Sequence, residues 1–184
     1  ILGKEIIWFH TVIWQAMLLA CQIELPQQTF THSFYMIDGQ KMSKSLGNAI
    51  SPQQLVELFG VDGARYLVAT SFPRDDDADV GISRYKERYN ADLANNLGNL
   101  VSRLAKLGQG LKLDDKQFEY DGQIQKLIDN LKFSEAIQVI FDRWINPVNA
   151  RLNQEEPWKK EASDKSRVEL LVWASNEIKT AAFH

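Results

Sequence analysis

Cysteine is the scarcest residue with distinctive chemistry in this 184-residue chain, which contains only Cys21. A single thiol excludes an intramolecular disulfide framework and a zinc site built from several cysteines, and it indicates a reducing compartment. No apolar stretch reaches the roughly 18 residues of a membrane-spanning helix, because His, Gln, Glu or Lys interrupts each one. The composition therefore predicts a soluble globular protein with no membrane partner.

Neither sign of charge dominates, since 21 Lys and Arg stand against 24 Asp and Glu, for a formal net charge of −3. This balance argues against a protein that coats nucleic acid through bulk positive charge. It leaves open a protein that binds RNA through a few local basic and aromatic side chains. With 45% apolar residues, the chain can fill one large core or two small ones.

The amino-terminal part predicts one strand–helix–strand unit. The apolar run from Ile6 to Phe9 is typical of a strand buried on both faces, and a helix capped by Thr11 should follow as far as residue 20. β-Branched and aromatic residues predict a second strand over 29–37, parallel to the first. Because one such unit cannot cover its own sheet, we expect a piece of a longer protein. The alternative is an edge strand in a complete small domain.

Turn and capping signals organise the next segment. Asp38-Gly39 is a hairpin-type turn signal, and Ser51 caps a helix that ends at Gly60. A solvated loop over 71–82 then precedes the main domain boundary.

From about residue 83 the pattern is helical, with leucines recurring at spacings of four and three along the first helix. A polar stripe lies beside those leucines and consists of Asp92, Asn96, Asn99 and Arg103. A further helix is predicted over 134–153, with a kink at Pro147. The fold class predicted is therefore α/β followed by an all-α helical bundle. Three segments result: 1–38 (βαβ), 39–82 (loop and connecting region) and 83–184 (bundle).

The strongest chemical signal is the run Lys41-Met42-Ser43-Lys44-Ser45. Two ammonium groups three residues apart on a loop can hold a triphosphate and follow charge that develops in a transition state. Ser43 and Ser45 can bind phosphate oxygens or cap the turn. Paired surface lysines are usually only a solvated surface, but this pentapeptide would occur by chance in such a chain only about once in ten thousand.

These five residues match the KMSKS signature of class I aminoacyl-tRNA synthetases, and the flanking sequence resembles methionyl-tRNA synthetases. The matching flanks are Gly3-Lys4-Glu5-Ile6, Phe9-His10-Thr11, Asp38-Gly39, Ser45-Leu46-Gly47-Asn48, residues 89–100 and Pro157-Trp158. The resemblance implies that residues 1–38 are the carboxy-terminal part of a Rossmann-type catalytic domain and that 39–82 hold the KMSKS loop and a stem-contact region. Residues 83–184 would be an anticodon-binding bundle that stops early.

The resemblance also implies a reaction and its residues. Methionine would be activated with ATP and Mg²⁺ to methionyl-adenylate and transferred to the 3′ end of tRNA(Met) in the cytoplasm. Lys44, helped by Lys41, would stabilise the transition state. The implied ATP-binding residues are Lys41, Met42, Ser43, Lys44, Ser45, Gly3 and Glu5, and the implied methionine pocket is Ile6, Phe9 and His10.

In the bundle, the resemblance implies that Asn99 and Arg103 hydrogen-bond anticodon bases and that Trp158 stacks on one of them. The spacing agrees, because Asn99 and Arg103 are i and i+4 on one helix face. From the residues alone, Trp158 could instead pack beneath its loop. The anticodon expected is CAU.

The sequence contains no His-x-Gly-His motif, which the family carries in an earlier strand–helix turn. We therefore expect this chain alone to be inactive, with any zinc knuckle confined to an upstream part. The alternatives are a non-catalytic tRNA-binding module, a different class I synthetase, and a purely structural bundle. The source organism and the oligomeric state do not follow from the sequence.

Overall fold

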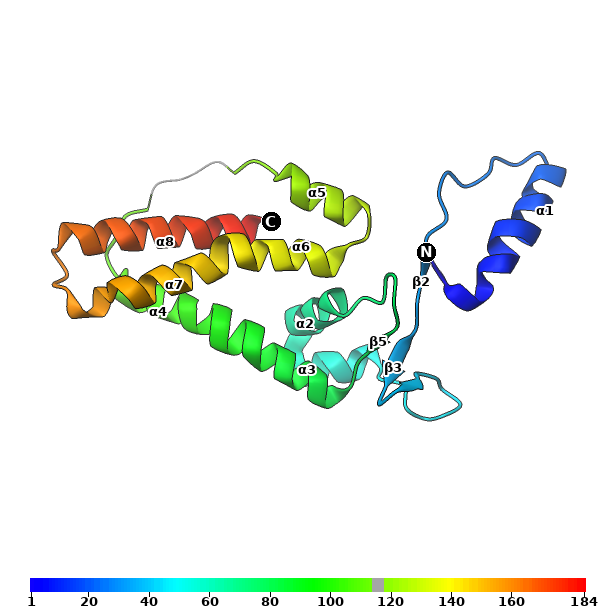
Figure 1. Ribbon diagram of the computed structural model, residues 1–184, viewed down its shortest axis with the longest axis horizontal. Helices are drawn as coiled ribbons and strands as arrows, with labels where there is room; N and C mark the ends of the chain where they lie inside the picture. The colour runs from blue at the N-terminus through cyan, green and yellow to red at the C-terminus, as the bar shows by residue number, and fades with distance from the viewer. Residues whose placement is uncertain (114–117) are drawn as a thin grey trace. The chain divides into compact units, whose positions relative to one another are not determined.

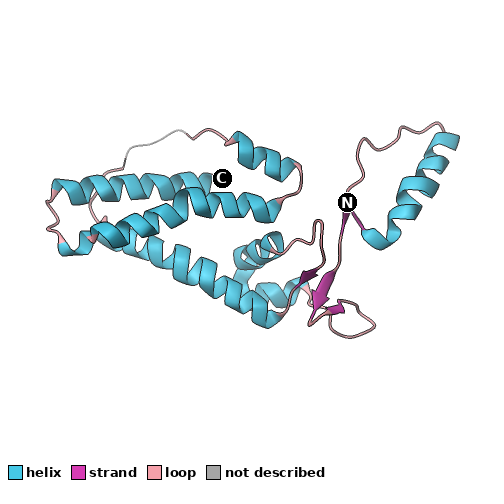
Figure 2. Ribbon diagram, viewed as in Figure 1, coloured by secondary structure: helices cyan, strands magenta, loops and turns pink. Residues whose placement is uncertain are grey.

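A computed structural model describes residues 1–113 and 118–184. The chain divides into two compact units, one made of residues 1–64 and 71–85 and the other of residues 65–70 and 86–184. Every strand in the described part belongs to the first unit, whereas the second is helical (Figure 2). None of the described helices combines the length and the apolarity needed to cross a membrane.

The first unit begins with the predicted strand–helix–strand arrangement. Strand β1 (Leu2–Gly3) pairs in parallel with β2 (Thr31–His32), and Leu2 lies opposite Thr31. Between them the chain is helical through η1 (Lys4–Ile6), η2 (Phe9–Ile13) and α1 (Trp14–Ala20), as Figure 1 shows. A parallel strand pair that flanks a helix is therefore present, but its first strand is Leu2–Gly3 and not the predicted Ile6–Phe9.

The strand predicted over Ile6–Phe9 is wrong, because these residues are helical. A short apolar run fits a buried strand and a helix segment equally well, and periodicity alone does not separate them. The predicted cap is also wrong. Thr11 lies inside the helix, where its hydroxyl donates to the carbonyl of Ile7 at 2.7 Å, the local bond that Thr forms in mid-helix.

The second predicted strand is divided in two by contacts with residues 73–77. The N–H of Ser33 donates to the carbonyl of Pro73 at 2.7 Å, and that of Phe34 donates to the Asp77 carboxylate at 2.8 Å. After this break, β3 (Tyr35–Ile37) lies at the centre of a three-stranded sheet. Its neighbours are β4 (Gln40–Lys41), which is antiparallel, and β5 (Ala78–Asp79), which is parallel.

The turn predicted at Asp38-Gly39 joins β3 to β4. Both residues have positive φ, 52° and 74°, which is the conformation of a type I′ hairpin turn. Their N–H groups donate to the two carboxylate oxygens of Asp79 at 3.1 and 3.3 Å. The turn therefore places Lys41 immediately beside β3.

Helix α2 (Pro52–Thr70) begins as predicted, since the Ser51 hydroxyl accepts from the N–H of Gln54 at 3.1 Å. Gly60 interrupts it with φ 71° and ψ 170°, so the predicted helix end at Gly60 is confirmed and a second helical segment follows. A positive φ at this position favours glycine over residues with a side chain.

The second unit is a bundle whose main members are labelled in Figure 1. Its elements are α3 (Ile82–Arg88, which starts in the first unit), η3 (Tyr89–Gly98), α4 (Asn99–Leu107), α5 (Gly122–Asp129), α6 (Phe133–Ile140), η4 (Phe141–Ile145), α7 (Asn146–Glu155), η5 (Pro157–Lys159) and α8 (Lys165–Phe183). The core is apolar and includes Leu100, Leu104, Trp144, Val148, Leu152, Leu170 and Leu171. Burial of the leucines on α4 agrees with the predicted leucine stripe.

Pro147 follows a change of helix type. The π-helical segment η4 ends at Ile145, and Pro147 then occupies the first turn of α7. A proline in the first turn of a helix costs little, because its missing N–H would have no intrahelical partner there. The predicted long helix is therefore present, with its interruption immediately before the proline.

Candidate functional site

The lysine-containing motif begins in a strand and continues into a tight turn. Lys41 is the last residue of β4, and the next N–H, that of Met42, donates to the Tyr35 carbonyl at 2.9 Å. Lys44 lies in the turn beyond, which the N–H of Gly47 closes onto the Lys44 carbonyl at 3.1 Å. The two lysines are thus held differently, one by the sheet and one by the loop.

The hydroxyls of the motif organise this turn. The N–H of Leu46 donates to Ser43 Oγ at 3.2 Å, and Ser43 Oγ lies 3.2 Å from Ser45 Oγ. Asn48 links the two ends, because it accepts from the Ser43 N–H at 2.8 Å and donates to the Lys41 carbonyl at 3.3 Å. Of the two roles expected for Ser43, the structure shows turn capping, and it adds Asn48 as the residue that fixes the loop.

The ammonium of Lys41 is paired with a carboxylate, whereas that of Lys44 is not. The Lys41 ammonium lies 3.0 Å from a Glu5 carboxylate oxygen and 3.9 Å from the centre of the Phe34 ring. Lys4 forms a parallel arrangement, 2.5 Å from Asp77 and 4.3 Å from the same ring. In the described part of the chain, no hydrogen bond or ion pair involves the exposed Lys44 ammonium. Of the two motif lysines, Lys44 is therefore the one whose ammonium has no protein partner among the described residues.

These ion pairs depress carboxyl pKa values. The hydrogen bond from Lys41 lowers the pKa of Glu5, and the bond from Lys4, aided by the Phe34 N–H, lowers the pKa of Asp77. Both carboxylates are exposed, so solvent screens the pairs and each contributes little to stability. The two ion pairs instead set the positions of the Lys4 and Lys41 ammonium groups.

Replacing Lys41 by methionine should raise the pKa of Glu5 toward its ordinary value and leave that of Asp77 unchanged. Because each pKa is lower in the folded protein than in the unfolded chain, each ion pair stabilises the fold at pH values above the ordinary pKa of the carboxyl. This stabilisation is lost as the pH falls through the lowered pKa. Carboxyl-carbon chemical shifts followed by NMR against pH measure both groups. Lys4→Met is the reciprocal control, which should move Asp77 instead. Equal titration of Glu5 in the wild type and Lys41→Met would contradict the pairing.

Glu5 lies beside Lys41, with a carboxylate oxygen 3.0 Å from its ammonium, and Gly3, in β1, lies next to the Glu5 side chain. The ATP site that the resemblance implies stays a prediction. The implied methionine-pocket residues Ile6, Phe9 and His10 share one helix face by their spacing. Ile6 and Phe9 are exposed, at 38% and 59%, and His10 Nδ1 lies 3.0 Å from the Ile6 carbonyl. The pocket itself stays a prediction.

The predicted polar stripe in the bundle mostly serves to join helices. Asp92 accepts from the hydroxyl of Tyr66 at 2.8 Å, and burial together with this bond raises the pKa of Tyr66. Asn96 lies 3.0 Å from Asn146 and 2.5 Å from Asn149 through side-chain amide bonds. Asp92 and Asn96 therefore join helices, and Arg103 lies at the other end of the stripe.

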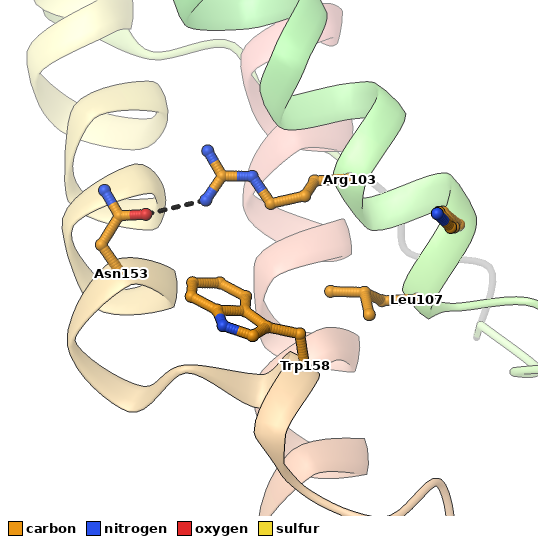
Figure 3. Close-up of a pocket in the computed structure, with 5 residues that line it drawn as sticks. Arg103, Leu107, Asn153 and Trp158 are labelled. Carbon is orange, nitrogen blue, oxygen red and sulfur yellow. Dashed lines mark hydrogen bonds between the residues drawn. The ribbon is translucent and has the colours of Figure 1, made fainter.

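A pocket of about 430 Å³ opens at that end of the stripe (Figure 3). It is lined by Arg103, Lys106, Leu107, Asn153 and Trp158. Arg103 donates to Asn153 Oδ1 at 2.7 Å, and its guanidinium lies 5.8 Å from the centre of the Trp158 ring. Trp158 is 43% exposed and follows the buried Pro157. Trp158 therefore lines the pocket with part of its ring uncovered, and its stacking on an anticodon base stays a prediction.

Sequence reasoning identified two residues of this pocket and missed three. Asn99, predicted to act with Arg103, is exposed one turn earlier on α4 and does not line the pocket. Asn153 had a detectable signal, because the asparagines at 146, 149 and 153 recur at helical spacing like the stripe at 96, 99 and 103. Lys106 and Leu107 carried no signal beyond the leucine periodicity.

No cluster of three or more His, Cys, Asp or Glu within residues 1–113 and 118–184 could hold a metal ion.

Sequence comparison assigns this arrangement to a family. The profile of the family described as tRNA synthetases class I (M) matches residues 1–105, which is more than half of the chain. The chain belongs to the class I methionyl-tRNA synthetase family. The match covers the whole loop that contains Lys41 and Lys44 and reaches the first pocket residue, Arg103.

Members of this family align over nearly the full chain. The methionine–tRNA ligase of Clostridium perfringens is 34% identical over 100% of this chain and 31% of its own length. That of Synechocystis is 32% identical over 100% of this chain and 38% of its own length. The Mycobacterium tuberculosis methionyl-tRNA synthetase, solved in complex with methionyl-adenylate, is 30% identical with a TM-score of 0.79 over 98% of this chain and 39% of that chain. The chain thus spans about a third of the length of its curated relatives.

Proposed function

We propose that this chain supplies the phosphate-binding loop and the anticodon-binding bundle of a cytoplasmic methionyl-tRNA synthetase, with MgATP, methionine and tRNA(Met) as substrates. The carboxylate of methionine attacks the α-phosphorus of ATP, pyrophosphate leaves, and methionyl-adenylate forms. The methionyl group then passes to the 3′-terminal ribose, and AMP leaves. The observation that supports this most is the Lys41–Ser45 motif, held by a sheet and an ordered turn in a chain that aligns with methionine–tRNA ligases throughout.

Within this proposal the loop acts by electrostatics. Charge develops on the phosphate oxygens and on the departing pyrophosphate, and a positioned ammonium stabilises it more in the transition state than in the ground state. Lys44 is exposed at the turn and carries this role. Lys41, which is paired with Glu5, assists it once ATP competes for the ammonium.

A non-catalytic tRNA-binding module is the second candidate. One observation favours it: the second unit has a core and a pocket of its own, with no residue of the lysine motif among them. Binding of RNA would then be retained without activation of methionine.

Anticodon selectivity tests the proposal. We expect the 184-residue chain to bind a stem-loop with the CAU anticodon more tightly than one with an unrelated anticodon, as measured by fluorescence anisotropy at fixed salt. Each mismatched base in a protein–nucleic acid site typically costs about 1–3 kcal/mol, or roughly 5- to 150-fold in affinity. Equal affinities for the two loops would overturn the assignment to methionine.

ATP–pyrophosphate exchange separates the two candidates. The isolated chain should show no exchange. In a chimera, this chain replaces the aligned 39% of the Mycobacterium tuberculosis synthetase. Exchange in the chimera supports the ligase, whereas CAU-selective binding without exchange supports the module.

A further inference from the structure

Resting on the proposed anticodon function, we propose that two unassigned residues divide the work of the Trp158 pocket. Asn153 positions the Arg103 guanidinium so that it reads the edge of an unpaired base. Lys106 binds the backbone phosphate of the nucleotide stacked on Trp158. Base selection and phosphate binding thereby reside on different side chains of one pocket.

The residues that line the pocket indicate which kind of ligand it suits. The Trp158 ring offers a flat, half-exposed aromatic face and Leu107 an apolar side, which together suit a planar heterocycle. A volume of about 430 Å³ lies in the range of about 300–1,000 Å³ common for small-ligand sites. Two cationic side chains and one amide complete the lining, so the ligand has acceptor atoms and a negative charge. An unpaired nucleotide within a strand meets all of these requirements.

Asn153 fixes the direction of Arg103. The guanidinium has five N–H donors in a rigid plane, and Asn153 on α7 accepts from one of its Nη1 hydrogens at 2.7 Å (Figure 3). The remaining donors keep a fixed orientation beside the Trp158 ring, 5.8 Å away. A base stacked on that ring would present its edge to them. Asn153 thus acts through Arg103, as a positioning residue.

Lys106 has no such anchor. It lies one turn beyond Arg103 on α4 and lines the same pocket, and no ion pair in the described part of the chain involves its exposed ammonium. An ammonium is a point charge suited to phosphate and has no planar fork with which to read a base edge. A contact of this kind adds affinity for every sequence equally.

A salt titration tests Lys106. The affinity for the stem-loop should fall as the salt concentration rises, in the wild type and in Lys106→Ala. The slope of log K against log salt should be smaller in Lys106→Ala by about 0.7, the value for one phosphate contact on a single strand. Selectivity between the CAU loop and a one-base variant should stay unchanged. Lys126→Ala, on α5 and outside the pocket lining, is the matched control and should leave the slope unaltered. An unchanged slope in Lys106→Ala, or the same loss in Lys126→Ala, would refute the phosphate contact.

Selectivity tests Asn153. Asn153→Ala should lower the preference for CAU over one-base variants by about fivefold, the effect of one hydrogen bond, and leave the salt slope as it is. Asn146→Ala is the matched control, because it removes a comparable side-chain bond of α7, made two turns away to Asn96 on η3, the segment that α4 continues. A structural role would make both variants lose thermal stability and affinity for all loops alike. Loss of selectivity in Asn153→Ala alone supports positioning, and its absence refutes it.

Failure of this inference is distinct from failure of the proposed function. If wild-type chain shows no CAU preference, the proposed function fails. If the preference is present and both variants match the wild type in slope and selectivity, only the division of work fails.

Discussion

Replacing Lys44 by alanine should slow methionine activation in the chimera by about 10²- to 10³-fold, the loss typical of removing one group that stabilises transition-state charge. Lys44 is exposed on a turn that Ser43 and Asn48 hold in place, so the change removes an ammonium without disturbing packing. Because the interaction forms in the transition state, kcat for ATP–pyrophosphate exchange should fall more than KM for ATP rises.

Lys41→Ala should have a smaller effect, because Glu5 already holds that ammonium in the absence of substrate. Lys126→Ala is the control for loss of one positive charge elsewhere and should leave exchange unchanged. Wild-type exchange by the Lys44→Ala chimera would remove Lys44 from the mechanism.

The loop illustrates what sequence can establish. The turn at Asp38-Gly39 and the cap at Ser51 were predictable because each depends on residues within a few positions. The pentapeptide between them pointed to the class I synthetase family. The ion pair between Glu5 and Lys41 was not predictable, since it joins residues 36 positions apart that only the folded first unit brings together.

The segment Ile6–Phe9 shows the opposite case. Its continuous apolar pattern predicts burial, and burial in turn suggested a strand. In the structure these residues are helical, and Trp8 and Phe9 are 63% and 59% exposed. An apolar run in the sequence shows that a segment has an apolar surface, but it does not show whether the segment is a strand or a helix or which residues cover that surface. The family's methionine-pocket assignment rests on this same segment.

In the bundle, periodicity predicted the helices and the inward leucines, because packing on a helix face repeats every three or four residues. It also marked the polar stripe, but it did not show which of its residues bond to the partner helix and which line the pocket. That distinction depends on the partner helix. The side chain of Asn96 bonds to both Asn146 and Asn149, whereas Asn153 accepts from a single donor nitrogen of Arg103.

Replacing Trp158 by alanine should weaken binding of the CAU stem-loop by about 5- to 150-fold, the equivalent of about 1–3 kcal/mol for one base stacked on an aromatic ring. The ring is 43% exposed and lies beside the Arg103 guanidinium, so alanine removes the stacking face and loosens its cationic neighbour. Thermal unfolding of the bundle should change little, because the buried core does not include Trp158.

The aromatic face, and not apolar volume, should account for this loss. Trp158→Phe should therefore retain most of the affinity, whereas Trp158→Leu should resemble alanine. Trp8→Ala, at a 63% exposed tryptophan of the first unit, is the control for loss of an exposed indole and should bind as the wild type does. Fluorescence anisotropy titrations of the four variants at one salt concentration decide the matter. Wild-type affinity in Trp158→Leu would show that no base stacks there, and the pocket would then need a different ligand.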